Sequence, residues 1–175
     1  MEDAHSESAS SRSFRAAVLT VSDKGAAGER EDTGGARLAQ LVTALPARVV
    51  ARAVVPDVLE AIRAKLVDVC DQHQVDLIVT TGGTGTALRD VTPEATASVI
   101  ERNVPGLAEI LRMEGYRKNR RAVLSRGVCG IRGRTLIVNL PGSLRAVEEG
   151  WEILLPLLPH ALDKLRGDPA DCGGG

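Results

Sequence analysis

The stretch LIVTTGGTGTALRDVTPEAT, residues 77–96, decides the fold of this chain. It begins with an apolar run typical of a buried strand, passes through a glycine-rich turn and an aspartate, and reaches a Thr-Pro pair typical of a helix start. In α/β proteins this order of elements holds a phosphate beside a carboxylate. We therefore expect an α/β protein, and a phosphate beside a carboxylate suggests a nucleotide bound with magnesium.

The rest of the chain alternates between strand and helix patterns. Strands are predicted at residues 16–21, 49–55, 75–81 and 135–140, with a short strand and glycine turn within 127–134, and helices are predicted from residues 32–34 onward and at 57–73, 92–101, 107–118 and 151–162. Apolar strands that alternate with helices indicate a mostly parallel sheet covered on both faces. The predicted fold class is therefore a three-layer α/β/α protein.

The bulk composition predicts a single domain. The chain has 175 residues, of which 43% are hydrophobic, enough to bury a core. Both ends are polar or glycine-rich, so we expect disordered tails at residues 1–13 and 168–175 around a domain at residues 14–167.

Charge and cysteine usage exclude several classes of partner. The 22 basic and 23 acidic residues nearly cancel, and no basic run is interleaved with aromatics, so no nucleic acid partner is expected. The polar N-terminus has no apolar core, and prolines interrupt the most apolar helix candidate, so no signal peptide and no membrane span are expected. The three scattered cysteines indicate reduced thiols in a cytoplasmic protein.

The glycine-rich turn is the first candidate binding element. It contains Gly82, Gly83, Thr84 and Gly85, whose backbone N–H groups could approach an anion without a Cβ in the way. The turn lacks the Gly-Lys-Ser/Thr of a Walker A loop and the third glycine of the dinucleotide fingerprint. A tight strand-to-helix turn would also account for these glycines.

Two aspartates are the candidate metal ligands. Asp90 precedes the helix start at Thr92, where a carboxylate could hold Mg²⁺ against nucleotide phosphates. Asp57 follows a predicted strand and would face the same edge of the sheet. Both have alternative interpretations, because Asp90 could stabilise a turn and Asp57 could be an N-cap.

Three further loops carry polar residues that could contact a ligand. Ser22 and Asp23 open a loop that could fold over a ligand or could be a surface connection. Ser125 and Arg126 could contact a phosphate, although a solvated surface run is the alternative. The loop after the last strand offers a second anion site at a helix N-terminus, with the candidates Asn139, Pro141, Gly142 and Ser143.

The phrases TVSD, VVPD, TTGGTG with RDVTPEAT, LSR, GIRG and NLPGS occur in this order. In this order and spacing they resemble the molybdopterin adenylyltransferase family of molybdenum cofactor biosynthesis, and the corresponding domains of plant and animal fusion proteins. The resemblance covers about residues 16–167 and departs from the family pattern at Leu144, where proline is common.

The resemblance implies roles for the candidate residues. Asp57 and Asp90 match the two functional aspartates, and Ser125 matches a serine that contacts the substrate. Residues 82–85 match the nucleotide-phosphate loop, and residues 139–142 match a second ligand loop. Whether the two aspartates share one Mg²⁺ ion stays open.

The resemblance also implies an activity and an assembly. The reaction is Mg²⁺-dependent adenylyl transfer from ATP to molybdopterin, which releases pyrophosphate. The expected assembly is a homotrimer with residues 107–116 and 151–165 as candidate subunit contacts, and a downstream molybdenum-insertion enzyme is a further expected partner. The alternatives are a paralogue that binds molybdopterin without adenylylating it and a scaffolding subunit of cofactor assembly.

Overall fold

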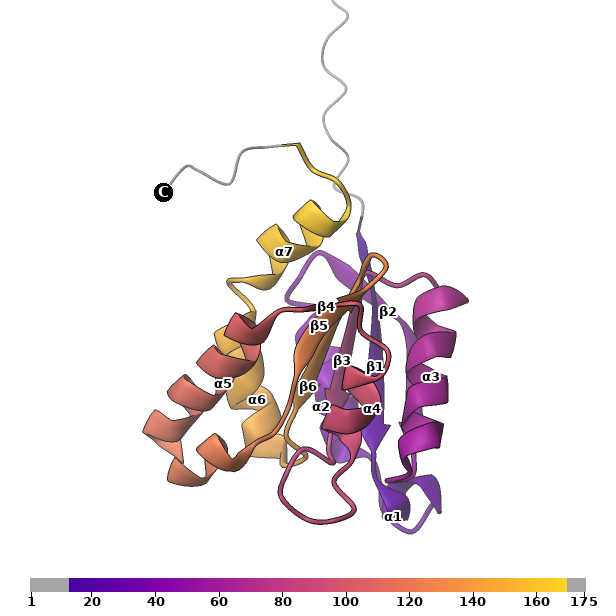
Figure 1. Ribbon diagram of the computed structural model, residues 1–175, viewed down its shortest axis with the longest axis vertical. Helices are drawn as coiled ribbons and strands as arrows, with labels where there is room; N and C mark the ends of the chain where they lie inside the picture. The colour runs from indigo at the N-terminus through magenta and orange to yellow at the C-terminus, as the bar shows by residue number, and fades with distance from the viewer. Residues whose placement is uncertain (1–12, 170–175) are drawn as a thin grey trace, which may run out of the picture.

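The computed structural model describes residues 13–169 and contains a central six-stranded sheet (Figure 1). Its strand order is β2-β1-β3-β6-β5-β4. The strands β1, β2, β3 and β6 are parallel, whereas β4 and β5 pair antiparallel at one edge. The bounds are β1 Phe14–Val21, β2 Ala47–Val55, β3 Leu77–Thr81, β4 Arg102–Asn103, β5 Cys129–Arg132 and β6 Thr135–Leu140.

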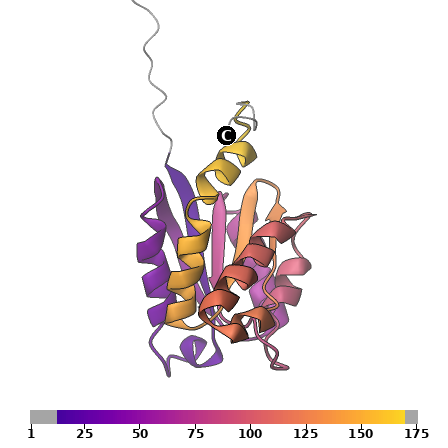
Figure 2. The same cartoon turned by 90° about the vertical axis from the view of Figure 1, so that its left-hand side faces the viewer.

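Helices cover both faces of the sheet, so the predicted three-layer fold is confirmed (Figures 1 and 2). The helices α2, α5, α6 and α7 pack on one face, and α3 and α4 pack on the other. The helical bounds are α1 Asp23–Ala26, α2 Thr33–Val42, α3 Leu59–Asp71, α4 Thr92–Ala97, α5 Pro105–Lys118, the 3₁₀ turn η1 Arg120–Leu124, α6 Leu144–Leu154 and α7 Leu158–Leu165.

The period of two along each strand separates the core into two clusters. On β1, Val18 packs with Leu38 and Trp151 on the face covered by α2 and α6. Its neighbour Leu19 packs with Ile62 of α3 on the opposite face. Because successive strand side chains point to opposite faces, one apolar strand serves both layers. This explains why the predicted strands are continuously apolar.

The apolar segment at residues 151–162 forms two helices, because the chain turns between α6 and α7. Trp151, 1% exposed, lies in the chain's own core together with Leu154, Leu158 and Leu162. These four side chains therefore cannot supply the subunit contact for which this segment was a candidate. On α5, the other candidate, Met113 is exposed.

The cysteines Cys70 and Cys129 are free and buried. Burial raises the pKa of Cys70 to about 11 and that of Cys129 to about 12. Neither thiol is therefore a nucleophile at neutral pH. Cys172 lies outside the described residues, as does most of both predicted tails.

The connections between strands create a ligand-binding position at one end of the sheet. The chain passes from β1 to β2 through α2 on one face and from β2 to β3 through α3 on the other. The carboxyl ends of β1 and β3 thus border a topological switch point, where open α/β sheets bind ligands. No helix within residues 13–169 is long and apolar enough to cross a membrane.

Candidate functional site

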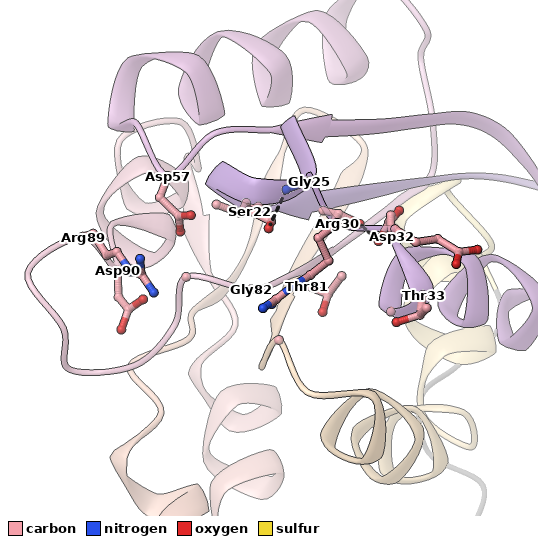
Figure 3. Close-up of a pocket in the computed structure, with 16 residues that line it drawn as sticks. Ser22, Gly25, Arg30, Asp32, Thr33, Asp57, Thr81, Gly82, Arg89 and Asp90 are labelled. Atoms are coloured by element: carbon pink, nitrogen blue, oxygen red, sulfur yellow. Dashed lines mark hydrogen bonds between the residues drawn. The ribbon is translucent and has the colours of Figure 1, made fainter. Parts of the chain in front are cut away.

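Two adjoining cavities lie at the carboxyl end of the parallel strands. The first, about 340 Å³, is bordered by the loops after β1, β2 and β3 and by the start of α2 (Figure 3). The second, about 520 Å³, lies between the loop after β3, the helices α5 and α6, and η1. Gly83, Asp90 and Gly142 border both cavities. Two ligands could therefore meet beside the Asp90 carboxylate.

Asp57 borders the first cavity and exchanges hydrogen bonds with Asp23. The Asp23 N–H donates to Asp57 Oδ2 at 2.9 Å, and the Asp57 N–H donates to Asp23 Oδ1 at 2.8 Å. The N-cap of α3 is Val58, with no side-chain capping bond, so the N-cap interpretation of Asp57 is wrong. The reciprocal pair instead fastens the loop after β1 to the loop after β2.

The surroundings of Asp57 favour an added positive charge. Burial raises the pKa of its carboxyl, and the nearby carboxylates of Asp23 and Asp90 raise it further. The hydrogen bond from the Asp23 backbone and the charge of Arg89 lower it, but the net direction is upward. A bound cation would offset the cost of burying the negative charge of Asp57 and would reduce the repulsion between the carboxylates. Asp57 is therefore well placed to be a ligand of a cation.

Asp90 has a turn role as well as a place in the cavities. Its Oδ2 accepts from the Ala87 N–H at 3.0 Å, and its own N–H donates to the Ala87 carbonyl at 2.9 Å. The turn interpretation is therefore correct for one oxygen. The side chain nevertheless borders both cavities, so this role does not exclude ligand binding.

The donor set fits a magnesium ion that is bound together with a phosphate ligand. Within residues 13–169 no group of three or more His, Cys, Asp or Glu side chains could hold a metal ion. Mg²⁺ commonly binds to one or two carboxylates and completes its shell with water and substrate phosphates. Asp57 and Asp90 match that pattern and do not match an all-protein metal cage.

The glycine turn is held by hydrogen bonds to neighbouring elements. Gly82 has φ of 100° and Gly83 has φ of 64°. A Cβ on Gly82 would lie 2.2 Å from the Val21 carbonyl oxygen, so the close approach requires glycine. The Gly82 N–H donates to the Leu140 carbonyl at 3.1 Å, so the expectation that this N–H binds an anion is wrong. Gly83 still borders both cavities.

Thr92 supports the glycine turn and does not cap α4. The helix starts at Thr92 itself with Val91 in the N-cap position, and it ends at Ala97. The buried Thr92 hydroxyl donates to the Gly82 carbonyl at 3.0 Å, and the Thr92 N–H donates to the Gly83 carbonyl at 3.1 Å. A Thr-Pro pair at a helix start predicts threonine as the N-cap; that prediction is wrong here, because the Thr92 hydroxyl binds the preceding turn.

The loop after β1 is partly helical. Ser22 caps α1 by accepting from the Gly25 N–H at 3.1 Å, and Asp32 caps α2 by accepting from the Gly35 N–H at 2.8 Å. Ser22 also borders the first cavity, as predicted. Asp23 borders a smaller adjoining hollow next to Asp57. The loop is therefore a folded wall of the site.

Two arginines that the sequence analysis did not select border the first cavity. Arg30 runs toward Gly82, and Arg89 lies beside Asp90 (Figure 3). Arg89 is the arginine of the RD pair within residues 77–96. Because it directly precedes the candidate ligand Asp90, the sequence could have indicated it. Arg30 lies in the middle of a loop, and no local pattern distinguishes it.

The second cavity gathers most of the remaining predicted residues: Gly83, Thr84, Gly85, Ser125, Asn139, Pro141, Gly142 and Ser143 all border it. Asn139 is buried and donates to the Thr80 and Thr96 hydroxyls, each at 3.0 Å. The Ser143 hydroxyl accepts from the Ala146 N–H at 3.2 Å and caps α6. Asn139 and Ser143 therefore shape the cavity wall.

The remaining walls of the second cavity combine apolar and charged groups. Leu111, Leu124 and Ile153 provide apolar surface, and Arg121 and Glu149 provide charge. No aromatic side chain borders it among the described residues. A planar polar ring would therefore lie against aliphatic groups with its polar edge near charged side chains.

Arg126 was expected to contact a phosphate or substrate, but its guanidinium has other partners. It donates to the carbonyls of Gly85 and Asp90 and pairs with Glu94. Arg126 borders neither the first nor the second cavity, whereas its neighbour Ser125 borders the second. The structure thus gives Arg126 these protein partners, where a phosphate contact and a solvated surface residue were the two alternatives.

The sheet and its paired cavities define a doubly wound α/β protein, a class in which ligands bind at the carboxyl ends of the strands. The sequence model of one family, described as a probable molybdopterin binding domain, matches residues 17–160. The chain therefore belongs to this molybdopterin-binding family.

Individual relatives agree with that assignment. A molybdopterin adenylyltransferase of Helicobacter pylori strain J99 is 39% identical over 153 residues, which cover 86% of this chain and 87% of the relative. The molybdopterin biosynthesis enzyme MoaB of Thermus thermophilus is 50% identical with a TM-score of 0.84, covering 90% of this chain and 99% of that one. The cofactor synthesis protein cinnamon of Drosophila melanogaster is 42% identical, but the match spans 86% of this chain and 25% of cinnamon. The resemblance to this family and to fusion proteins is confirmed.

Proposed function

We propose that this protein is a molybdopterin adenylyltransferase, which transfers the adenylyl group of ATP to the terminal phosphate of molybdopterin and releases pyrophosphate. The observation that carries this proposal is the junction of two cavities at Gly83, Asp90 and Gly142. A group transfer between two ligands needs such a junction, because the reacting atoms must lie within about 3–3.5 Å of each other. A protein that bound a single ligand would not need it.

The first cavity suits the triphosphate of ATP. Asp57 and Asp90 would hold Mg²⁺, which supplies charge neutralisation and orientation of the phosphates when it is bound. Arg30 and Arg89 add positive charge on the protein side, where they would face the departing pyrophosphate. The raised pKa of Asp57 supports a cation at this point.

The second cavity suits molybdopterin. Its aliphatic surface would hold the pterin ring, and its polar residues near Asp90 would face the phosphate. Ser125 would contact this ligand through its hydroxyl, which lies within 3.3 Å of the Gly127 N–H. The terminal phosphate would then point toward the first cavity.

The chemistry asks little covalent work of the protein. A phosphate oxygen of molybdopterin attacks the α-phosphorus of ATP, a new P–O bond forms, and the bond to pyrophosphate breaks. A phosphate monoester is largely ionised at neutral pH, so its oxygen can attack without a protein base. The side chains position the two phosphates and compensate their charge.

We further propose that the protein works in the cytoplasm as a homotrimer and passes its product to a molybdenum-insertion enzyme. Exposed apolar side chains on α5 and η1, including Met113 and Leu124, support an association of subunits. Sedimentation equilibrium would test the trimer, and a monomer at micromolar concentration would contradict it.

The decisive experiment incubates purified protein with molybdopterin, ATP and Mg²⁺ and measures pyrophosphate and adenylylated product. We expect product to form and Asp90→Asn to slow turnover by about 100-fold or more, since an electrostatic contact to the reacting phosphates is lost. Asp71→Asn is the matched control, because Asp71 pairs with Arg132 away from both cavities.

Other outcomes would favour the alternatives. Molybdopterin binding without product above the metal-free control would indicate a non-adenylylating paralogue. Full activity in cells that carry only the Asp57→Asn, Asp90→Asn double variant would indicate a scaffolding subunit.

A further inference from the structure

We propose that Arg126 is a positioning residue that holds Asp90 in place and links it to the second cavity. The loop it holds comprises residues 84–90, which we call the Asp90 loop. The claim that Arg126 holds this loop rests on hydrogen bonds alone. The claim that it affects turnover rests on the proposed function.

Arg126 contacts the Asp90 loop at both of its ends. Its N–H donates to the Thr84 carbonyl at 2.8 Å, and its Nε donates to the Gly85 carbonyl at 2.7 Å. At the other end of the loop its Nη2 donates to the Asp90 carbonyl. One residue therefore closes the loop across its base.

The same guanidinium is anchored to α4 through Glu94. The Arg126 Nη1 donates to Glu94 Oε1, and this hydrogen bond lowers the pKa of Glu94. An exposed ion pair adds little stability by itself. Its importance here is geometric, because a planar guanidinium can donate hydrogen bonds to the two carbonyls and the carboxylate at the same time. A lysine ammonium on its flexible side chain would do this poorly.

The rest of the Asp90 loop has few attachments. Residues 86–89 are exposed, and Leu88 projects fully into solvent. The bond pair between Ala87 and Asp90 lies inside the loop and does not fix it to the body of the protein. Arg126 therefore adds to the Thr92 bonds at Gly82 and Gly83, and its side chain attaches residues 84–90 to the body of the protein and helps to set where the Asp90 carboxylate lies.

Arg126 also lies next to a wall of the second cavity. Ser125 and Leu124 border that cavity, and Arg112 holds the other flank by donating to the Gly127 carbonyl at 3.0 Å. Arg126 therefore connects the Asp90 loop to the backbone that forms this wall of the second cavity.

The test compares Arg126→Gln with Arg132→Gln. Arg132 is a matched control, because its guanidinium also binds a carboxylate, Asp71, and a carbonyl, Val99, but away from both cavities. In metal-free protein we expect the Ala87 and Asp90 amides to exchange about tenfold faster in Arg126→Gln than in the wild type, since the loop opens locally. Arg132→Gln should leave both rates unchanged.

Kinetics provide the second measurement. In Arg126→Gln we expect the Mg²⁺ concentration for half-maximal turnover to rise by about tenfold, with little change in the KM for molybdopterin, because the metal ligand is misplaced while the second cavity remains. Arg126→Lys should behave like Arg126→Gln, and Glu94→Gln, which keeps the carbonyl contacts, should lie between it and the wild type.

The outcomes separate this proposal from the proposed function. Unchanged exchange at Ala87 and Asp90 in a folded Arg126→Gln protein would overturn the positioning role, even if the wild type is fully active. Faster exchange together with no pyrophosphate from the wild type would support the loop contact and overturn the proposed activity. A Mg²⁺ requirement equal to that of the wild type would overturn the link to Asp90.

Discussion

Asp57 follows β2 and Asp76 precedes β3, so they lie at opposite ends of the parallel part of the sheet, and their surroundings are opposite. Asp76, 7% exposed, receives hydrogen bonds from Arg166 Nε at 2.9 Å and Nη2 at 2.7 Å and from the Arg15 N–H at 2.7 Å. Burial alone would raise the pKa of Asp76, but these hydrogen bonds lower it below its ordinary value. Asp57 has a raised pKa, and within residues 13–169 no ion pair to it is formed.

The difference shows how a structural carboxylate can be distinguished from one that is available to a ligand. Asp76 already has its cation, and the pair fastens α7 to the amino end of the sheet. Asp57 lies near two carboxylates and accepts from a backbone N–H; the charge of Arg89 offsets its negative charge only in part, and no cationic side chain within residues 13–169 forms an ion pair with it. A carboxyl pKa raised by burial together with nearby carboxylates, at a cavity wall, marks Asp57 as a candidate functional group.

The largest effect should come from exchanging each aspartate for asparagine. We expect Asp57→Asn to lower turnover by about 100-fold or more while leaving the fold intact, because a metal ligand is lost. We expect Asp76→Asn to keep the turnover of folded molecules but to lower the free energy of unfolding by about 3 kcal/mol, because the part-buried ion pair with Arg166 is lost. Steady-state kinetics and urea unfolding measure the two effects, and a reversed pattern would refute the contrast.

Glycine substitutions at the two ends test the same comparison through the backbone. A Cβ on Gly82 would lie 2.2 Å from the Val21 carbonyl oxygen, whereas a Cβ on Gly133, at φ 57° in the turn between β5 and β6, would meet nothing within 4 Å. We expect Gly82→Ala to cost about 3 kcal/mol of unfolding free energy, since it combines strain with a clash. Gly133→Ala should cost about 1 kcal/mol, the strain alone. Equal costs in thermal or urea unfolding would show that the close approach at Gly82 is relieved cheaply.

The smallest effect concerns the dependence of stability on pH. The lowered pKa of Asp76 means that its contribution is present above the unfolded value of 3.8 and is lost as the pH falls through the folded pKa. The raised pKa of Asp57 means that ionisation is less favourable in the folded protein, so stability is lost as the pH rises through its folded pKa.

The two asparagine variants should therefore differ in sign. At pH 7 Asp76→Asn should be less stable than the wild type and Asp57→Asn slightly more stable, and both differences should shrink by pH 3. Urea unfolding at the two pH values measures this. A stability loss in Asp57→Asn that persists at both values would mean that its hydrogen bond to Asp23 outweighs its burial.

The sequence predicts those parts of the molecule that depend on local pattern. The four parallel strands, the start of α2 near residues 32–34 and the special backbone at Gly82 follow from residue type and spacing, whereas the two-residue strand β4 was not predicted. The grouping of Asp57 and Asp90 at one edge follows from the rule that parallel strands end together, whereas Ser125 was assigned to the site by the family resemblance. These features need no knowledge of distant contacts.

The parts that escaped prediction depend on pairs far apart in the chain. Asp57 and Asp23 are separated by 34 residues, Arg126 and Asp90 by 36, and Arg166 and Asp76 by 90. Thr92 is a residue type that is favoured at the N-cap, but its hydroxyl donates to the Gly82 carbonyl instead. Local signals cannot rank such competing partners, because the choice depends on tertiary geometry.

The glycine turn after β3 contacts the loop after β6 at Gly142, and this contact affects how constant the distance between the two cavities is. A Cβ on Gly142 would lie 3.2 Å from the Gly82 Cα, and the turns are joined by the Thr81 hydroxyl, which donates to the Pro141 carbonyl at 2.9 Å. Where the two cavities approach each other, this part of their common boundary is bare main chain. Main chain of this kind has no rotamers to sample, so the separation between the two cavities does not vary with side-chain motion at this point. The range over which that separation can vary is therefore set by the backbone of the sheet.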